Sequence, residues 1–498
     1  MKKITILTLA SALLLGACKK NLTDLNIDTK HPVNAPSHAL FTNAEKYMTD
    51  WLTTTSVTYN ITDQIAQYWT ETTYTDESNY NLGNRDIPLN FWNKLYNDAL
   101  NNLEQAKKLI PTDVADAAQA KNELEMADIL QVFTWYYLVN TYGNIPYTQA
   151  LNIDKYPFPQ YDDAKTIYMD LLTRLDSSIA GLNTGASGFG ADDILYGGDV
   201  PSWQKFANSL KLKMAMLIAD TDPATARTKV NEAVAAGVFT SNADNALFRY
   251  TGVTPNANPI WVDVIQSNRN DYVIASTLLD AMVTLNDPRR SKYYTNESSG
   301  ADIGGTVGDN NTWNNYSNIY WGVVKGTVVD PGAPSDLLDY SEVSFLLAEA
   351  VERGFIAGSA ETYYNDAVTA SIEYRGGTAS DASTYLAQPK VAYATAPGGA
   401  GAGAIGATGV NTSSVHWKQA IGMQKYLALY LRGLDAWTEI RRLYYPAMAI
   451  PTNAKTAFPW RYTYPSNEQT ANGDAYKAAA TALGGNGDKV TTKLFWMQ

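Results

Sequence analysis

The sequence predicts a mostly α-helical protein, and two observations support this fold class. First, no long stretch alternates apolar and polar residues with the period of two that is typical of a half-buried strand. Second, apolar residues recur at steps of three and four, the spacing of an amphipathic helix, in Met126, Ile129, Leu130, Phe133, Tyr136 and Tyr137. The same spacing recurs later, for example in Leu210, Met214, Leu217 and Ile218.

The elements follow in order along the chain. Helices are expected at about 36–55, 57–71, 88–109, 112–141, 160–181, 203–218, 272–286, 338–353, 359–374 and 412–442. Asp222-Pro223 is typical of a helix start, and Gly237 and Gly354 are typical of helix ends. Several neighbouring helices have the length of helical-hairpin repeats. Between the helices lie long polar loops that carry aromatic residues, chiefly 72–87, 240–270 and 291–334.

The first residues are typical of an exported lipoprotein. Lys2 and Lys3 precede an apolar run that is too short to span a bilayer, and Leu15-Gly16-Ala17-Cys18 resembles a bacterial lipobox. We therefore expect residues 1–17 to be a signal peptide, 18–34 a tether lipidated at Cys18, and 35–498 the helical domain. The alternative is an ordinary secretory peptide with an incidental cysteine.

Composition limits the possible chemistry. The net charge of −12 argues against nucleic acid and anionic membrane surfaces as partners. Cys18 is the only cysteine and His31, His38 and His416 are the only histidines, so no metal site or cofactor is expected. No segment after the signal peptide is apolar enough to cross a membrane, so the lipid alone would hold the protein there. The 33 tyrosines and 12 tryptophans suit core packing as well as sugar or peptide binding.

Catalysis by a pair of carboxylates is a second hypothesis. Asp162-Asp163 or Asp192-Asp193 would supply the two acids of a lipid-anchored glycoside hydrolase. Adjacent acids are more often helix starts or solvated loops, which makes an enzyme the weaker interpretation. A purely structural helical scaffold is a third hypothesis, and the aromatic-rich loops disfavour it.

Six segments, in order, resemble the SusD/RagB family of outer-membrane lipoproteins. Gly198-Asp199 with Trp203–Leu212 resembles the hallmark helix of the family, and Tyr142–Ala150 (YGNIPYTQA) resembles its helix-closing turn. The other matches are Asp287-Pro288-Arg289, Glu342–Ala350, Gln424-Lys425-Tyr426 with Trp437–Arg442 and Tyr445-Pro446, and Arg461–Pro465 with Glu468 and Asn472. We expect Glu342, Glu349, Arg441 and Arg442 to pair across packed helices.

The resemblance implies a fold and a function. The fold is an all-α, right-handed superhelix of tetratricopeptide-like helix pairs, with long irregular loops forming the ligand face. The function is to capture a glycan or peptide at the cell surface and deliver it to a SusC-like TonB-dependent outer-membrane transporter, without catalysis. The sequence Cys18-Lys19-Lys20-Asn21 lacks the acidic cluster that often follows the cysteine in surface-exposed members. The loops do not match starch-binding members closely, so starch is not carried over.

Two loop segments concentrate aromatic and hydrogen-bonding side chains outside the helical periodicity. Aromatic faces stack on sugar rings or peptide side chains, and loops position binding residues on a rigid scaffold. The alternative is that these rings cover the helices or contact the transporter. The candidate ligand contacts are Trp69, Tyr74, Tyr80 and Arg85 in the first segment and Trp313, Tyr316, Tyr320 and Trp321 in the second.

Overall fold

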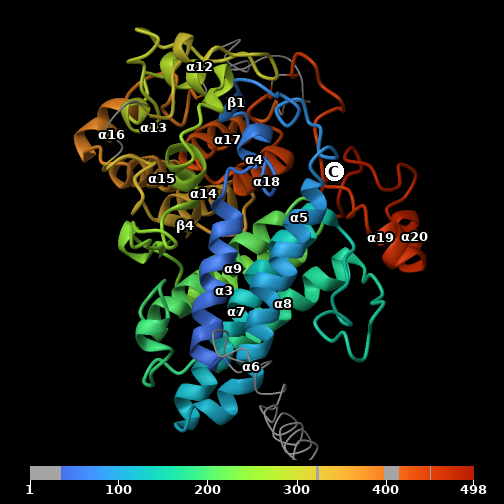
Figure 1. Cartoon of the computed structure of the whole chain (residues 1–498). Coiled ribbons are helices and arrows are strands. Elements are labelled where there is room, and N and C mark those ends of the chain that lie inside the picture. The colour runs from blue at the N-terminus through green and yellow to red at the C-terminus, as the bar shows by residue number, and fades with distance from the viewer. Residues whose placement is uncertain (1–34, 321–324, 397–413, 449) are drawn as a thin grey trace, which may run out of the picture.

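A computed structural model describes residues 35–320, 325–396, 414–448 and 450–498 (Figure 1). The predicted signal peptide, tether and Cys18 lie outside these residues, and so does Trp321. Within the described part of the chain, no helix is long and apolar enough to cross a membrane.

Helix pairs stacked in succession form the body of the protein. The pairs are α7 (Ala117–Tyr142) with α8 (Ala164–Gly181), α9 (Val200–Leu217) with α10 (Pro223–Ala236), α14 (Tyr340–Glu352) with α15 (Ala360–Tyr374), and α17 (His416–Ala428) with α18 (Gly433–Leu443). Each pair also packs on the next, through α8 and α9, α9 and α14, and α14 and α17. The predicted all-α superhelix of tetratricopeptide-like pairs is thereby confirmed.

Other helices cover one side of the stack. Helix α3 (Ser37–Thr53) packs along α6 (Asn101–Asp113), which continues α5 (Ile87–Lys94) through the π-helical turn η1 (Leu95–Leu100).

The shorter helices are α4 (Thr62–Ile65), α11 (Pro259–Trp261), the π-helix η4 (Val262–Gln266), α12 (Ser276–Thr284), α13 (Arg290–Tyr293), α16 (Ala379–Leu386), α19 (Glu468–Ala471) and α20 (Gly473–Ala482). Three 3₁₀ turns are η2 (Gly190–Asp192), η3 (Asn242–Asp244) and η5 (Trp313–Asn315).

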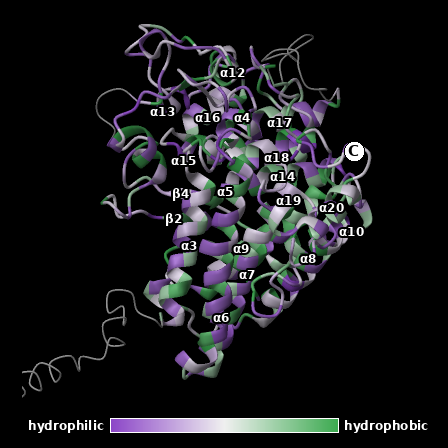
Figure 2. Ribbon diagram, turned by 45° about the vertical axis from the view of Figure 1, so that its right-hand side comes forward, coloured by the Kyte–Doolittle hydropathy of each residue, from purple (hydrophilic) through white to green (hydrophobic). Residues whose placement is uncertain are grey.

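Two short antiparallel strand pairs join loops that lie far apart in the sequence. Strand β1 (Trp69–Glu71) pairs with β3 (Tyr272–Ile274), and β2 (Ala246–Phe248) pairs with β4 (Ser335–Leu338). The loops near α12 and α13 carry many hydrophilic residues and lie at the opposite end of the molecule from α6 (Figure 2). The strands therefore organise the loop region beside the helical stack.

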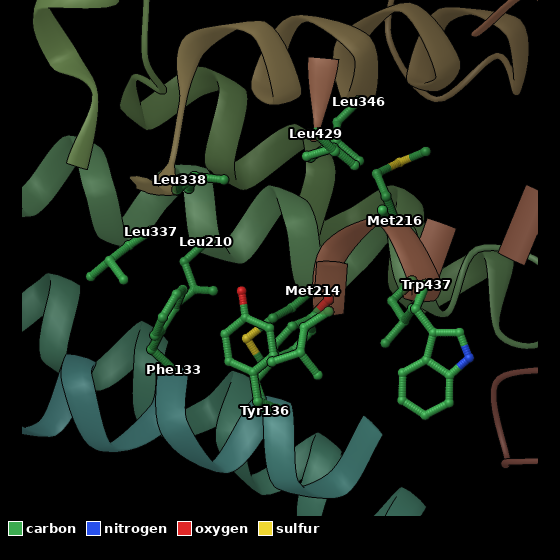
Figure 3. Close-up of a cluster of buried hydrophobic side chains, with 14 of the residues drawn as sticks. Phe133, Tyr136, Leu210, Met214, Met216, Leu337, Leu338, Leu346, Leu429 and Trp437 are labelled. Carbon is green, nitrogen blue, oxygen red and sulfur yellow. The ribbon is translucent and has the colours of Figure 1, made fainter. Parts of the chain in front are cut away.

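The core lies where the helix pairs meet. Figure 3 shows Phe133 and Tyr136 of α7 facing Leu210 and Met214 of α9. All four side chains are almost completely buried. The three- and four-residue spacing predicts these α7 positions as core, and they are buried, but residues 129–142 of α7 are buried on every side and not along one face only. The predicted start of α10 is also confirmed, because the Asp222 side chain accepts a hydrogen bond from the Thr225 amide.

Three of the expected helices differ in the structure. Residues 57–71 hold only the short α4 followed by strand β1, since Gln67 adopts a left-handed conformation with φ 55°. The segment 272–286 begins as β3 before α12 starts at Ser276. The segment 412–442 is two helices, with Leu431 at φ 72° between them.

A buried ion-pair network crosses the stacked pairs. Arg442 binds both carboxylate oxygens of Glu349, at 2.5 and 2.6 Å, as predicted. Glu342 pairs with Lys213 at 3.1 Å and with Arg432. Arg441 differs from the prediction, because it donates to backbone carbonyls and lies 3.6 Å from the Trp437 ring centroid. Burial lowers the pKa of Arg441 to about 9.

Candidate ligand-binding site

The structure brings the two predicted loop segments together. The Asn79 side chain donates to the Gly308 carbonyl at 2.7 Å. The Asn311 amide donates to the Thr72 carbonyl at 3.0 Å. With the β1–β3 pair beneath them, residues 69–86, 269–275 and 303–320 form one continuous unit, which we call the loop platform.

Asn79 is the central connection of the loop platform. Its Oδ1 accepts from the Asn453 amide at 2.9 Å, so the C-terminal segment is tied to the same point. Gly308 has φ +78°, and a Cβ there would lie 2.4 Å from Asn79 Oδ1. Glycine is therefore required at position 308 for the loops to approach so closely.

Two of the eight candidate residues are buried within the loop platform. Trp69 is fully buried, and its indole N–H donates to the Tyr430 hydroxyl at 2.9 Å. Tyr80 is only 2% exposed and accepts from Gln67 at 3.0 Å. Neither ring has a face open to a ligand, so both stabilise the loop platform through buried contacts.

Other candidates remain at the surface. Tyr74 is 76% exposed, while Trp313 and Tyr320 are partly exposed with ring centroids 5.9 Å apart and tilted by 55°. Tyr316, also partly exposed, follows directly after η5. Tyr320 points its hydroxyl toward the Val264 carbonyl at 3.4 Å. Trp313 and Tyr320 thus form a pair of aromatic faces at the edge of the platform.

Arg85 is held by an acid pair inside the first loop. Its Nε donates to Glu77 at 2.7 Å, and 41% of the side chain is exposed. Glu77 is buried, and Glu71 is bound by the Ser78 amide at 2.9 Å. Burial raises the pKa of Glu71 to about 9, and the charge of Glu77 acts in the same direction. This direction favours the protonated form of Glu71, so the two carboxyl groups can lie close together without two full negative charges.

A cavity of about 400 Å³ lies beside α11, and the sequence did not predict it. Its walls come from the end of α3, α13, β4, α15 and the turn between α17 and α18. Asp336, Tyr374, Arg375 and Lys292 are among its polar lining residues. No sequence motif connects these residues, because they come from three segments that only the fold brings together.

The acid pairs considered for hydrolysis are occupied by structural contacts. Asp163 caps α8 through the Thr166 amide, and Asp162 accepts from the Tyr147 and Thr148 amides. Asp193 is buried and accepts from the indole N–H of Trp203 at 2.7 Å. Asp192 pairs with His38 at 2.9 Å. In this structure these four carboxylates stabilise loops and helix starts.

Comparison with known proteins places the chain in a family. A family model described as SusD-like_2, "Starch-binding associating with outer membrane", matches residues 29–465. The chain therefore belongs to the SusD-like family, whose description names a binding activity and an outer-membrane association. A comparison with curated proteins finds no match.

Solved structures agree with this assignment. A protein described as a chitin-binding protein is 25% identical, with a TM-score of 0.77 over 93% of this chain and 100% of that one. A SusD homolog from Bacteroides uniformis is also 25% identical, with a TM-score of 0.75 over 93% and 99% of the two chains. A chitin-binding SusD homolog from Flavobacterium johnsoniae shares the fold at 21% identity, with a TM-score of 0.74 over 92% and 98%.

Proposed function

We propose that the protein captures a glycan on the loop platform and delivers it to a SusC-like TonB-dependent transporter in the outer membrane. One observation carries the proposal. Two aromatic-bearing loops, separated by more than 200 residues, are locked together while Trp313 and Tyr320 stay partly exposed. Rigid aromatic faces with nearby polar groups suit the stacking and hydrogen bonding that sugar rings need.

A glycan is favoured over a peptide as the ligand. The family description names starch, and two of the similar structures are named for chitin binding. Binding without catalysis is favoured because the acid pairs considered for hydrolysis cap helices and hold loops. The relevant partner is thus a polysaccharide fragment that leaves the protein unchanged.

The direct experiment is a calorimetric screen of the mature, lipidated protein in detergent against panels of oligosaccharides and peptides. We expect saturable binding of at least one neutral oligosaccharide, with no new products after long incubation. Failure of every oligosaccharide to bind, or release of shortened sugars, would contradict the proposal.

The membrane anchor is the second part of the proposal. Cleavage before Cys18 and acylation of its thiol would hold the 18–34 tether at the outer membrane. Each buried CH₂ contributes about 0.8 kcal/mol and a single acyl chain anchors only marginally, so we propose more than one chain. Cys18→Ala should move the protein from the membrane pellet to the soluble fraction. Retention of this variant in the pellet would rule the anchor out.

The transporter is the third part. Because the protein has no evident means of moving its ligand across a membrane, it needs a stable partner that transports the ligand. An obligate assembly of this kind buries roughly 2,000 Å² or more in total. Detergent extraction from the native cells and affinity capture should recover a TonB-dependent barrel in equal amount. Recovery of a lone monomer would argue against delivery to a transporter.

A further inference from the structure

The cavity of about 400 Å³ lies apart from the loop platform and has an unusual set of charges. In Figures 1 and 2, α13, α15 and β4, which contribute to its walls, lie on the same side of the molecule. Segment α11–η4 borders both sites, because Ile260 lines the cavity and the Val264 carbonyl accepts from Tyr320 of the platform.

One carboxylate on the cavity wall, Asp336, lies near two cations but pairs with only one of them, Arg375. Arg375 has Asp336 as its only carboxylate partner within the described chain, at a long 3.6 Å. The Tyr374 hydroxyl donates to the same carboxylate. The Lys292 ammonium lies beside Gly376, the residue that follows Arg375, and is 3.8 Å from where a Cβ on Gly376 would be. Among the described residues, no carboxylate lies within 4.0 Å of the Lys292 nitrogen.

The third cation of the cavity, Arg432, is already neutralised. It binds Asp435 at 3.0 Å and Asp339 at 3.1 Å, and it also contacts Glu342. Among the described cations that line the cavity, the one without a carboxylate partner is therefore Lys292. In a chain with a net charge of −12, a cavity wall with surplus positive charge is a specific feature.

We propose that this cavity binds an acidic sugar residue, a hexose that carries a carboxylate or a sulfate, within the captured glycan. The anionic group would pair with Lys292 and with the guanidinium of Arg375, which also donates to the Tyr430 carbonyl at 3.2 Å. Guanidinium and ammonium groups are strong donors to such oxygens. Ser291 and Tyr374 on the same wall offer hydroxyls for the remaining sugar hydroxyls. The volume lies within the range of about 300–1,000 Å³ that is usual for small-ligand pockets.

This inference rests on the proposed function in one respect, namely that the ligand is a glycan. It adds the chemical class of the glycan, and it predicts a salt dependence that the aromatic platform alone would not produce. Binding through an ion pair weakens as ionic strength rises, whereas stacking on aromatic faces does not.

The test is calorimetry on the mature protein with D-galacturonate, galactose 6-sulfate and neutral D-galactose. We expect at least one acidic sugar to bind and galactose not to bind, with affinity for the acidic sugar falling in high salt. Lys292→Gln should weaken that binding at least fivefold, and because Lys292 is exposed the variant should fold. Lys155→Gln, the same charge change at an exposed loop elsewhere, should leave it unchanged.

Three results would overturn the cavity assignment. They are absence of binding by both acidic sugars, binding that Lys292→Gln leaves intact, and tighter binding of the dipeptide Gly-Gly, whose carboxylate would mark a peptide site. If a neutral oligosaccharide then still binds and responds only to Trp313→Ala, the proposed function stands and this inference fails. If acidic sugars bind through Lys292 but no oligosaccharide responds to Trp313→Ala, the platform function fails instead.

Discussion

The amide of Asn79 donates to the carbonyl of Gly308 at 2.7 Å, across 229 positions of sequence. This bond joins the loop that presents Tyr74 and Arg85 to the loop that presents Trp313 and Tyr320. The geometry of the proposed ligand site therefore depends on a side chain that is itself buried and contacts no ligand.

Asn79→Ala should lower glycan affinity. The substitution removes the 2.7 Å hydrogen bond to the buried Gly308 carbonyl, which keeps only a 3.4 Å contact from the Asn453 side chain, and it removes the acceptor of the Asn453 amide. A buried group that loses its hydrogen-bond partner costs about 1–3 kcal/mol. We expect at least a tenfold loss of affinity, measured by calorimetry. Asn84→Ala is the matched control, because Asn84 lies in the same loop but is exposed. Equal affinity in both variants would mean that the loops do not act as one platform.

Trp313→Ala should weaken glycan binding several-fold with little change in the melting temperature. A lost aromatic contact costs about 1 kcal/mol or more, and Trp313 is only partly buried. Phe158→Ala removes an aromatic ring that is 65% exposed in a different loop, so its affinity should equal that of the native protein. Trp69→Ala should instead reduce the free energy of unfolding by about 3–5 kcal/mol. Similar affinity losses in the Trp313 and Phe158 variants would place the site elsewhere.

Glu342→Gln should strongly destabilise the fold. Glu342 is buried between Lys213 and Arg432, and removing one partner of a buried charge pair costs about 3–5 kcal/mol. Urea unfolding measures this directly. Glu104→Gln, which removes a partly exposed pairing with Lys108, should change the free energy of unfolding by less than about 1 kcal/mol. A Glu342 variant as stable as the Glu104 variant would show that the network contributes little.

His38 should make stability depend on pH. Partial burial lowers its pKa, but hydrogen bonds and the charges of Asp192 and Glu123 outweigh burial and hold the pKa above 6.5. The folded state then binds the proton more tightly than the unfolded state, so this stabilisation is complete below pH 6.5 and disappears as pH rises through the folded pKa. The difference in unfolding free energy between native protein and His38→Gln should be larger at pH 6 than at pH 8.5. A pH-independent difference would contradict the assignment.

The helical stack could be predicted from the sequence because the residue spacing that indicates each helix lies within that helix. The spacing from Met126 to Tyr137 predicts a helix, and its apolar residues are buried, although α7 is buried on every side from Ile129 onward. The prediction of a helix at 57–71 was wrong, because strand β1 forms by pairing with β3, about 200 residues later in the chain. No local sequence pattern indicates such a pairing. The helix breaks at Leu431, which has φ 72°, and the next helix starts at Gly433, where a Cβ would lie 2.5 Å from the Asp63 amide.

The candidate site could be predicted only in part. Aromatic residues in long loops indicated the two segments that form the platform. Which rings would be buried depended on distant partners, such as Tyr430 for Trp69 and Gln67 for Tyr80. The cavity at Lys292 and Arg375 had no sequence signal at all, because its walls come from separate helices and a strand.

A crystal structure with the tightest-binding oligosaccharide from the screen is the most direct test of the central claim. We predict sugar density against Trp313 and Tyr320, with hydrogen bonds from the loop platform and little movement of the Asn79–Gly308 connection. Clear density for the oligosaccharide at any other surface, with the platform empty, would contradict the account.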